Sequence, residues 1–145
     1  MKDHGRIRVL LVGGEADSRE PAAALREHLE GARVLTAPDA DAGFEVLESQ
    51  RMDCLVSTYR LPEGDGLTFF GAVREEYPDL PFVLFAGADD ADLARRALSA
   101  GVAGYVRKET GEEQYVVLAH RIRTAIEVSP SASDGVEREE VSREL

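Results

Sequence analysis

The sequence predicts a doubly wound α/β domain, in which a parallel five-stranded sheet carries helices on both faces. Five short runs are apolar almost throughout, as expected of strands that are buried on both faces. Each run is followed by a segment with apolar residues at helical spacing. The 145 residues, 43% of them hydrophobic, suffice for one core and are too few for two ordinary domains. We therefore expect one domain over 1–128 and a disordered acidic tail or linker over 129–145.

The predicted strands are mostly apolar runs between turn residues, and they cover 7–12, 33–37, 53–58, 81–86 and 102–107. The predicted helices share apolar residues three or four apart, and they begin near Asp17 or Ser18, at Asp39, near Leu67, at Asp89 or Asp90, and near Glu112. The first helix carries Pro21 in its expected first turn, where proline is tolerated, and stops near Gly31. Gly101 ends the fourth helix in the same way.

The charge of the chain narrows the classes of partner. A net charge of −11 argues against nucleic acid and membrane surfaces, since both attract clustered Lys and Arg. No stretch approaches the ~20 apolar residues that span a bilayer, and the start lacks the apolar segment of a secretory signal. We therefore expect a cytoplasmic protein. Its single cysteine, Cys54, has no His or second Cys at ligand spacing, so we expect a buried core residue.

Lysine is rare in this chain. Fifteen Arg stand against two Lys, Lys2 and Lys108, among 28 acidic residues. An acidic, lysine-poor composition is typical of proteins from extreme halophiles, in which negative charge keeps the chain soluble in concentrated salt. An ordinary acidic cytosolic protein is the alternative interpretation.

Ligands of such sheets gather where the carboxyl ends of the strands meet the loops. Around those positions the landmarks are Val9-Leu10-Leu11-Val12, then Ser57-Thr58-Tyr59-Arg60-Leu61-Pro62 with Gly64-Asp65-Gly66, and Gly101-Val102-Ala103-Gly104-Tyr105 ahead of Lys108. Together and in this order they resemble the receiver domain of two-component response regulators, over about 6–127. The resemblance implies a flavodoxin-like sheet with strand order 2-1-3-4-5 and a role in phosphorelay signal transduction. The composition makes haloarchaeal receivers the nearest branch.

The resemblance also implies a site. In that family, two acidic residues after the first strand and a third at the end of the third strand bind Mg²⁺, and the third carboxylate accepts the phosphoryl group. A hydroxyl residue after the fourth strand and a lysine after the fifth hold the phosphoryl oxygens. Here the acidic pair becomes Gly13 and Gly14, the phosphoacceptor becomes Thr58, the hydroxyl residue becomes Ala86, and Lys108 alone is retained.

Three further positions bear on this site. Glu15 matches an acidic position beside the pair, but one carboxylate is a poor Mg²⁺ cage. Tyr105 matches the aromatic switch residue of the family, although a half-buried structural Tyr is as good an interpretation. Glu109 stands where the family has proline, so we expect a trans bond after Lys108. Lys108 then holds an anion, pairs with Glu15, or is an ordinary rim lysine.

Other acidic residues do not supply the missing acceptor. Asp53 lies five residues back along the third strand, ~16 Å away at the opposite edge of the sheet. Asp65 sits between glycines in a turn, which favours a structural role. The group Asp89-Asp90-Asp92 is interpreted as an acidic helix start. The histidines, interpreted as surface residues rather than metal ligands, are His4, His28 and His120.

These observations favour a pseudo-receiver that binds a protein partner, with no catalytic residue, metal or cofactor. The docking surface implied by the resemblance is the fourth helix, fifth strand and fifth helix, with Arg95, Tyr105 and Val117 as candidate contacts. One alternative is a receiver that phosphorylates itself through an unexpected acid. Another is a flavodoxin-type binder of a small ligand in a cleft near Gly13 and Thr58.

Overall fold

The structure of the chain is a computed structural model that describes residues 6–87 and 91–128, without the side chains of 15–18 and 91. The predicted tail over 129–145, the helix cap at Asp89 or Asp90, and His4 lie outside the described residues. Within the described part, no helix is long and apolar enough to cross a membrane.

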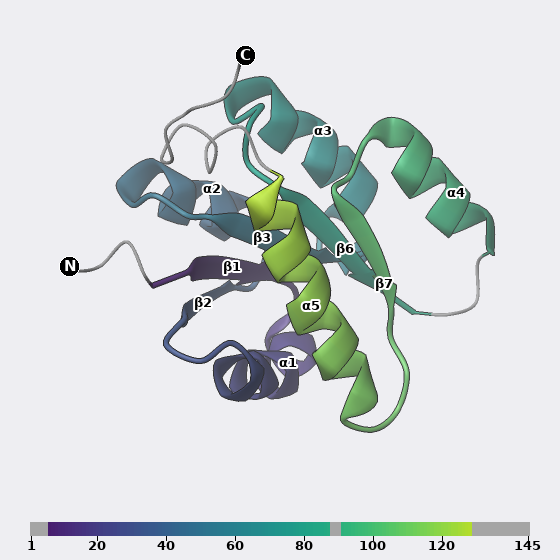
Figure 1. The fold of residues 1–145 in the computed structure, drawn as a ribbon. Coiled ribbons are helices and arrows are strands. Elements are labelled where there is room, and N and C mark those ends of the chain that lie inside the picture. The colour runs from purple at the N-terminus through teal and green to yellow at the C-terminus, as the bar shows by residue number, and fades with distance from the viewer. Residues whose placement is uncertain (1–5, 88–90, 129–145) are drawn as a thin grey trace, which may run out of the picture.

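Five parallel strands form the central sheet (Figure 1). They are β1 (Arg8–Val12), β2 (Arg33–Ala37), β3 (Cys54–Thr58), β6 (Phe82–Ala86) and β7 (Gly104–Arg107). Their order in space is β2-β1-β3-β6-β7, which confirms the predicted order 2-1-3-4-5. A small antiparallel ribbon, β4 (Arg60–Leu61) with β5 (Gly64–Asp65), lies outside this sheet and was not predicted.

Helices cover both faces of the sheet (Figure 1). They are α1 (Glu15–His28), α2 (Ala40–Ser49), α3 (Gly66–Glu76), α4 (Ala91–Ala100) and α5 (Glu113–Glu127). One buried cluster joins the sheet to α1 and α5, and a second joins its other face to α2, α3 and α4. The doubly wound architecture is therefore confirmed.

Cys54 is fully buried as predicted. Burial raises the pKa of its thiol well above the ordinary value, and the charge of Asp53 adds to the shift.

The start of α1 differs from the prediction. The helix begins at Glu15, so a cap at Asp17 or Ser18 is wrong. Gly14 is the N-cap, with extended backbone (φ −54°, ψ 149°) and no side-chain cap bond, which is why no capping residue marked the position. Pro21 consequently lies inside the helix, beyond the first turn, where its missing N–H leaves out one backbone hydrogen bond.

The other helix starts follow the expected capping chemistry. Asp39 accepts a hydrogen bond from the Ala42 N–H at 2.8 Å and caps α2 as predicted. Asp65 accepts from the Thr68 N–H at 2.8 Å and caps α3, which confirms its structural role. Asp53 accepts from the Arg8 N–H at 2.9 Å at the amino ends of the strands, the edge to which its position along β3 assigned it.

Candidate functional site

The carboxyl ends of four strands lie in one line. The register that aligns them pairs Val12 with Ser57, Thr58 with Phe85, and Ala86 with Arg107. The residues that follow or end these strands, Gly13, Thr58, Ala86 and Lys108, therefore meet at one edge of the sheet. The Lys108 N–H continues the ladder by donating to the Ala86 carbonyl at 2.7 Å. This edge is the candidate site.

Thr58 is turned inward at this edge. Its side chain is almost fully buried, with 2% of its surface exposed. Its Oγ1 donates to the Arg60 carbonyl at 3.1 Å, two residues along the chain, and the neighbouring Ser57 Oγ donates to the Thr58 carbonyl at 2.8 Å. Both hydroxyl groups thus satisfy backbone carbonyls where β3 leaves the sheet.

Thr58 packs directly onto Gly13. A Cβ placed on Gly13 would lie 2.9 Å from Thr58 Cγ2, closer than real Cβ atoms approach, and 3.0 Å from Thr58 Oγ1, a tight contact. The space that a side chain at position 13 would need is therefore taken by Thr58. Thr58 and Gly13 leave no room between them, and a cleft beside them stays a prediction of the flavodoxin-type alternative.

The backbone of residue 58 is enclosed from the other side by the start of α3. A Cβ on Gly66 would lie 2.6 Å from the Thr58 carbonyl oxygen and 2.8 Å from Leu84 Cδ1. The Gly66 N–H donates to the Tyr59 carbonyl at 2.6 Å. The absence of a side chain at Gly66 is what allows α3 to begin this close to the end of β3.

Lys108 lies against an aromatic ring. Its ammonium nitrogen is 5.5 Å from the centroid of the Phe85 ring, within the range of a cation–π contact. A cavity of about 380 Å³ adjoins it, lined by Glu20 and Tyr115 among others. Burial raises the pKa of the Tyr115 hydroxyl, and the carboxylates of Glu20 and Glu112 raise it further.

Among the described peptide bonds none is cis, so the bond after Lys108 is trans as predicted. The side chain of Glu15 lies outside the described part, so its predicted pairing with Lys108 stays a prediction.

Tyr105 and Ala86 sit on the face of the sheet toward α4. Ala86 is fully buried, and the half-buried Tyr105 packs at the edge of the same cluster. Sequence reasoning missed a hydrogen bond beside them, which Arg96 Nη2 of α4 donates to the Tyr59 hydroxyl at 3.3 Å. This bond joins α4 to the loop after Thr58. The two residues are 37 positions apart, so no local sequence pattern could have predicted their contact.

Comparison with known proteins decides the family. Residues 9–120 match the family model described as response regulator receiver domain. The chain belongs to this family. It is 31% identical over 81 residues to the DNA-binding transcriptional regulator NtrC of Proteus hauseri, covering 56% of this chain and 17% of the relative. It is also 31% identical over 133 residues to the bacterioopsin transcriptional activator of Halobacterium salinarum, covering 90% of this chain and 19% of the relative.

Solved receiver structures share the fold. The signal receiver domain of an HD domain-containing protein from Pseudomonas fluorescens superposes with a TM-score of 0.74 at 24% identity, covering 90% of this chain and 94% of that one. The first curated relatives are far longer than this chain, which spans less than a third of each. The comparisons therefore describe the receiver domain and not a whole regulator.

The Mg²⁺ ion that the receiver family implies finds no suitable donor set among the described side chains of this edge. Gly13, Gly14 and Ala86 offer no side-chain oxygen, and the Thr58 hydroxyl is engaged with the Arg60 carbonyl. Mg²⁺ prefers an octahedron of hard oxygen ligands, usually with carboxylates among them. The residues that the structure describes at this edge do not fit the ion.

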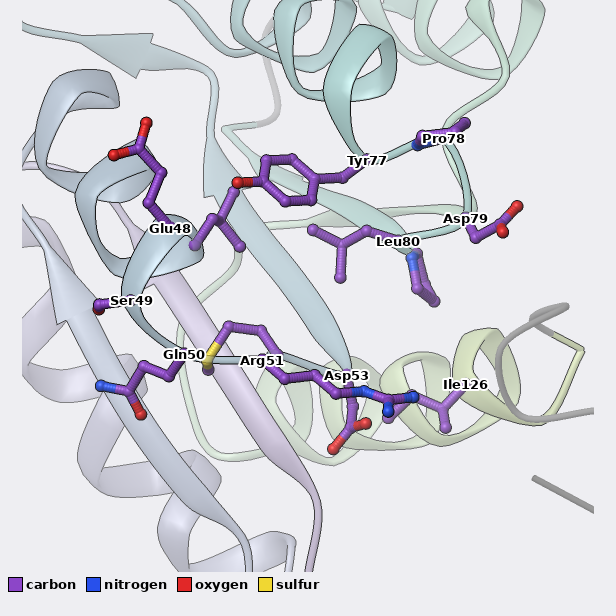
Figure 2. A pocket seen from close by; sticks show the side chains of 13 residues that line it. Glu48, Ser49, Gln50, Arg51, Asp53, Tyr77, Pro78, Asp79, Leu80 and Ile126 are labelled. Carbon is purple, nitrogen blue, oxygen red and sulfur yellow. The ribbon is translucent and has the colours of Figure 1, made fainter. Parts of the chain in front are cut away.

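A separate cavity lies at the opposite, amino-terminal edge of the sheet. Figure 2 shows this cavity, of about 580 Å³, between the loop after α2, the loop after α3 and the end of α5. The Tyr77 ring and the Leu80 side chain border it above, and the Arg51 side chain extends beneath them toward Ile126. Burial, Glu76 and Glu48 raise the pKa of the Tyr77 hydroxyl. Sequence reasoning missed this cavity because its walls come from three separate segments.

Proposed function

We propose that this receiver domain is a protein-interaction module of a signalling pathway that acts without forming a phospho-aspartate at the strand-end site. The observation that supports it is the fit between Thr58 and Gly13: the two positions that should carry carboxylates are filled by a small hydroxyl side chain packed on a glycine. On this proposal the domain is not an enzyme.

The chemistry of phosphoryl transfer supports the same proposal. The accepting group must be an activated nucleophile, and a metal must neutralise the charge that develops on the phosphoryl oxygens. The Thr58 hydroxyl is neutral, 2% exposed and bonded to a carbonyl rather than to a base. The positions beside it, Gly13 and Gly14, carry no side chain that could hold the metal.

The proposed contact region is the α4–β7–α5 surface, defined by Arg95, Leu98, Tyr105, Arg107, Val117 and Arg121. Leu98 and Val117 are large apolar side chains with 57% and 48% of their surface exposed. Arg95 and Leu98 are three apart on α4 and share a side of it, as do Val117 and Arg121, four apart on α5. The Arg121 side chain lies over Gly104 of β7, since a Cβ there would be 2.6 Å from Arg121 Cγ.

The charge of this surface indicates which kind of protein surface it would bind. Arg107 and Arg121 contribute positive charge in a chain whose net charge is −11, and Arg95 contributes a guanidinium that is ion-paired with Asp92. Complementary potentials guide association and exclude partners of the wrong sign. The partner should therefore present an acidic surface around an apolar centre that receives Leu98 and Val117.

Incubation with acetyl phosphate and Mg²⁺, followed by intact-mass measurement, tests the first part of the proposal. We expect the mass of the full chain to remain unchanged, because no described side chain at the strand ends can accept and hold the group. A stoichiometric phosphoryl adduct that is lost in base would contradict the proposal, since base lability is the property of an acyl phosphate.

Two neighbouring valines provide a matched test of the surface. Val116 and Val117 are exposed to 49% and 48%, but Val116 follows Glu112 by four residues and so faces α1 instead of β7. A partner captured from native cytosol should bind Val117→Asp at least about tenfold more weakly and Val116→Asp as well as the unchanged chain. Equal losses for both variants would place the contact elsewhere.

We further propose that the domain works in the cytoplasm of a salt-rich cell. Its 28 acidic residues against 17 basic ones create self-repulsion that salt screens. The midpoint of thermal unfolding should rise steadily as KCl is raised from about 0.1 M to about 2 M. A midpoint that is flat or falls over this range would favour an ordinary acidic cytosolic protein.

A further inference from the structure

Three metal-ligating side chains from two distant segments meet on the face of the sheet that carries α1 and α5. Glu27 and His28 occupy the last turn of α1, and Glu112 precedes α5. One ligand atom of each lies within 4.8 Å of the other two. His28 Nε2 and Glu112 Oε1, 84 residues apart in sequence, are separated by 3.0 Å.

We propose that Glu27, His28 and Glu112 bind one divalent transition-metal ion of the zinc type, with water in the remaining position. Ligand atoms held at ~2.0–2.1 Å around a tetrahedral ion lie about 3.3 Å from one another. His28 and Glu112 lie close to that spacing, at 3.0 Å, and on this proposal the exposed Glu27 side chain, whose ligand atom lies within 4.8 Å of both, rotates to complete the site.

The donor set selects the class of ion. An imidazole nitrogen suits zinc, nickel, copper and cobalt, whereas Mg²⁺ and Ca²⁺ prefer sites made of oxygen alone. Two carboxylates balance the charge of a divalent ion, and three protein ligands leave a position open for water. The site is distinct from the strand-end edge, and it stands whether or not Thr58 accepts a phosphoryl group.

The packing of α1 on α5 holds the ligands in place. The buried side chains of both helices belong to one core cluster. Arg123 Nη2 of α5 donates to the His28 backbone carbonyl at 2.5 Å, which fixes the end of α1 against α5. Glu112 follows the loop of residues 108–111, so a bound ion would tie the loop that begins at Lys108 to the end of α1.

Zn²⁺ titration of the full chain by calorimetry, with Co²⁺ as the spectroscopic probe, tests the site. We expect one ion per chain, visible Co²⁺ absorption of a nitrogen- and oxygen-ligated ion, and an unfolding midpoint raised by several degrees with Zn²⁺. His28→Ala and Glu112→Gln should each weaken binding by about tenfold or more. His120→Ala, which removes an exposed histidine elsewhere on α5, is the matched control and should bind as the unchanged chain does.

Circular dichroism of each variant without metal shows whether it is folded, so a loss of binding is read only from folded protein. For a variant that does not fold, Glu27→Gln provides the same test at an exposed position. Zn²⁺ bound as tightly by His28→Ala as by the unchanged chain would overturn the proposal. So would the absence of saturable one-to-one binding, which would leave His28 and Glu112 as a hydrogen-bonded pair alone.

Discussion

The two sides of the strand-end site are held by different forces. On the closed side, defined as Gly13, Thr58 and Gly66, side chain and backbone pack without spare room. On the open side, defined as Lys108 and the cavity of about 380 Å³ beside it, the lysine lies over the ring of the buried Phe85. Close packing is sensitive to each added atom, whereas contacts at an exposed rim are individually weak. The closed side should therefore govern stability, and the open side should tolerate change.

Gly66→Ala should give the largest loss of stability. Its new methyl group would meet the Thr58 carbonyl oxygen at 2.6 Å, and a backbone oxygen cannot rotate away. We expect the free energy of unfolding to fall by about 3 kcal/mol, at the upper end for overpacking. Chemical denaturation measures it.

Gly71→Ala is the control within the same helix. A Cβ there has no neighbour within 4 Å, and alanine favours helix, so this variant should gain about 0.5–1 kcal/mol. If Gly66→Ala were as stable as Gly71→Ala, the close approach of α3 to Thr58 would not exist and the comparison between the two sides would fail.

Gly13→Ala should be the next most damaging change, by about 1–3 kcal/mol, because its Cβ collides with the Thr58 side chain. Thr58→Ala removes both colliding atoms, so the loss from Gly13→Ala should shrink in that background. A double-mutant cycle measures this coupling, which we expect to be about 1–2 kcal/mol.

Gly64→Ala, where a Cβ has no neighbour within 4 Å, should cost the same in the unchanged chain as in the Thr58→Ala background. Purely additive losses for Gly13→Ala and Thr58→Ala would mean that Thr58 does not occupy the space over Gly13. The principal support for a site without phosphoryl transfer would then be lost.

Much of this architecture could be predicted because its signals are local. The apolar strands and their order follow from runs of residues that cannot face water. The cap at Asp39 follows from a side chain that accepts a nearby N–H. The start of α1 was missed because Gly14 caps it without a side chain, and the β4–β5 ribbon because strands of two residues show no periodicity.

The site was predictable only in part, for a related physical reason. Position along the strands placed Gly13, Thr58 and Lys108 at one edge. The contact of Thr58 with Gly13 joins residues 45 positions apart, and the meeting of His28 with Glu112 joins residues 84 apart. Ligand spacing within one helix cannot detect such pairs. Side-chain packing in three dimensions decides them.

On the open side, Lys108→Met should lower the unfolding free energy by only about 0.5–1 kcal/mol. The substitution keeps the length of the side chain and removes its charge from the Phe85 ring. Phosphate at matched ionic strength should stabilise the unchanged chain and Lys108→Met equally, as measured by the shift of the unfolding midpoint. If phosphate stabilised only the unchanged chain, Lys108 would hold an anion. The open side would then be an anion-binding site and not a tolerant rim.

The smallest change in pH dependence is expected for Tyr115→Phe, and this change should be confined to alkaline solution. Burial, Glu20 and Glu112 raise the pKa of the Tyr115 hydroxyl above its ordinary value of about 10 in the folded chain. The unfolded chain then loses this proton first, so the stability that the group contributes is complete below about pH 10 and falls as the pH rises toward the folded pKa.

Tyr115→Phe removes this titration. Its unfolding free energy should therefore decline less steeply than that of the unchanged chain above about pH 10, while the two curves run parallel between about pH 7 and 9. Tyr77 lies at the opposite edge of the sheet, and burial, Glu76 and Glu48 raise its pKa. Tyr77→Phe should therefore behave in the same way. The double variant Tyr77→Phe/Tyr115→Phe should show the smallest decline in unfolding free energy above about pH 10. Denaturant unfolding across this pH range measures it. If the unfolding free energies of Tyr115→Phe and the unchanged chain fell in parallel above pH 10, the Tyr115 hydroxyl would be as well hydrated in the folded chain as in the unfolded one. Water in the cavity beside Lys108 would then reach Tyr115 at the start of α5.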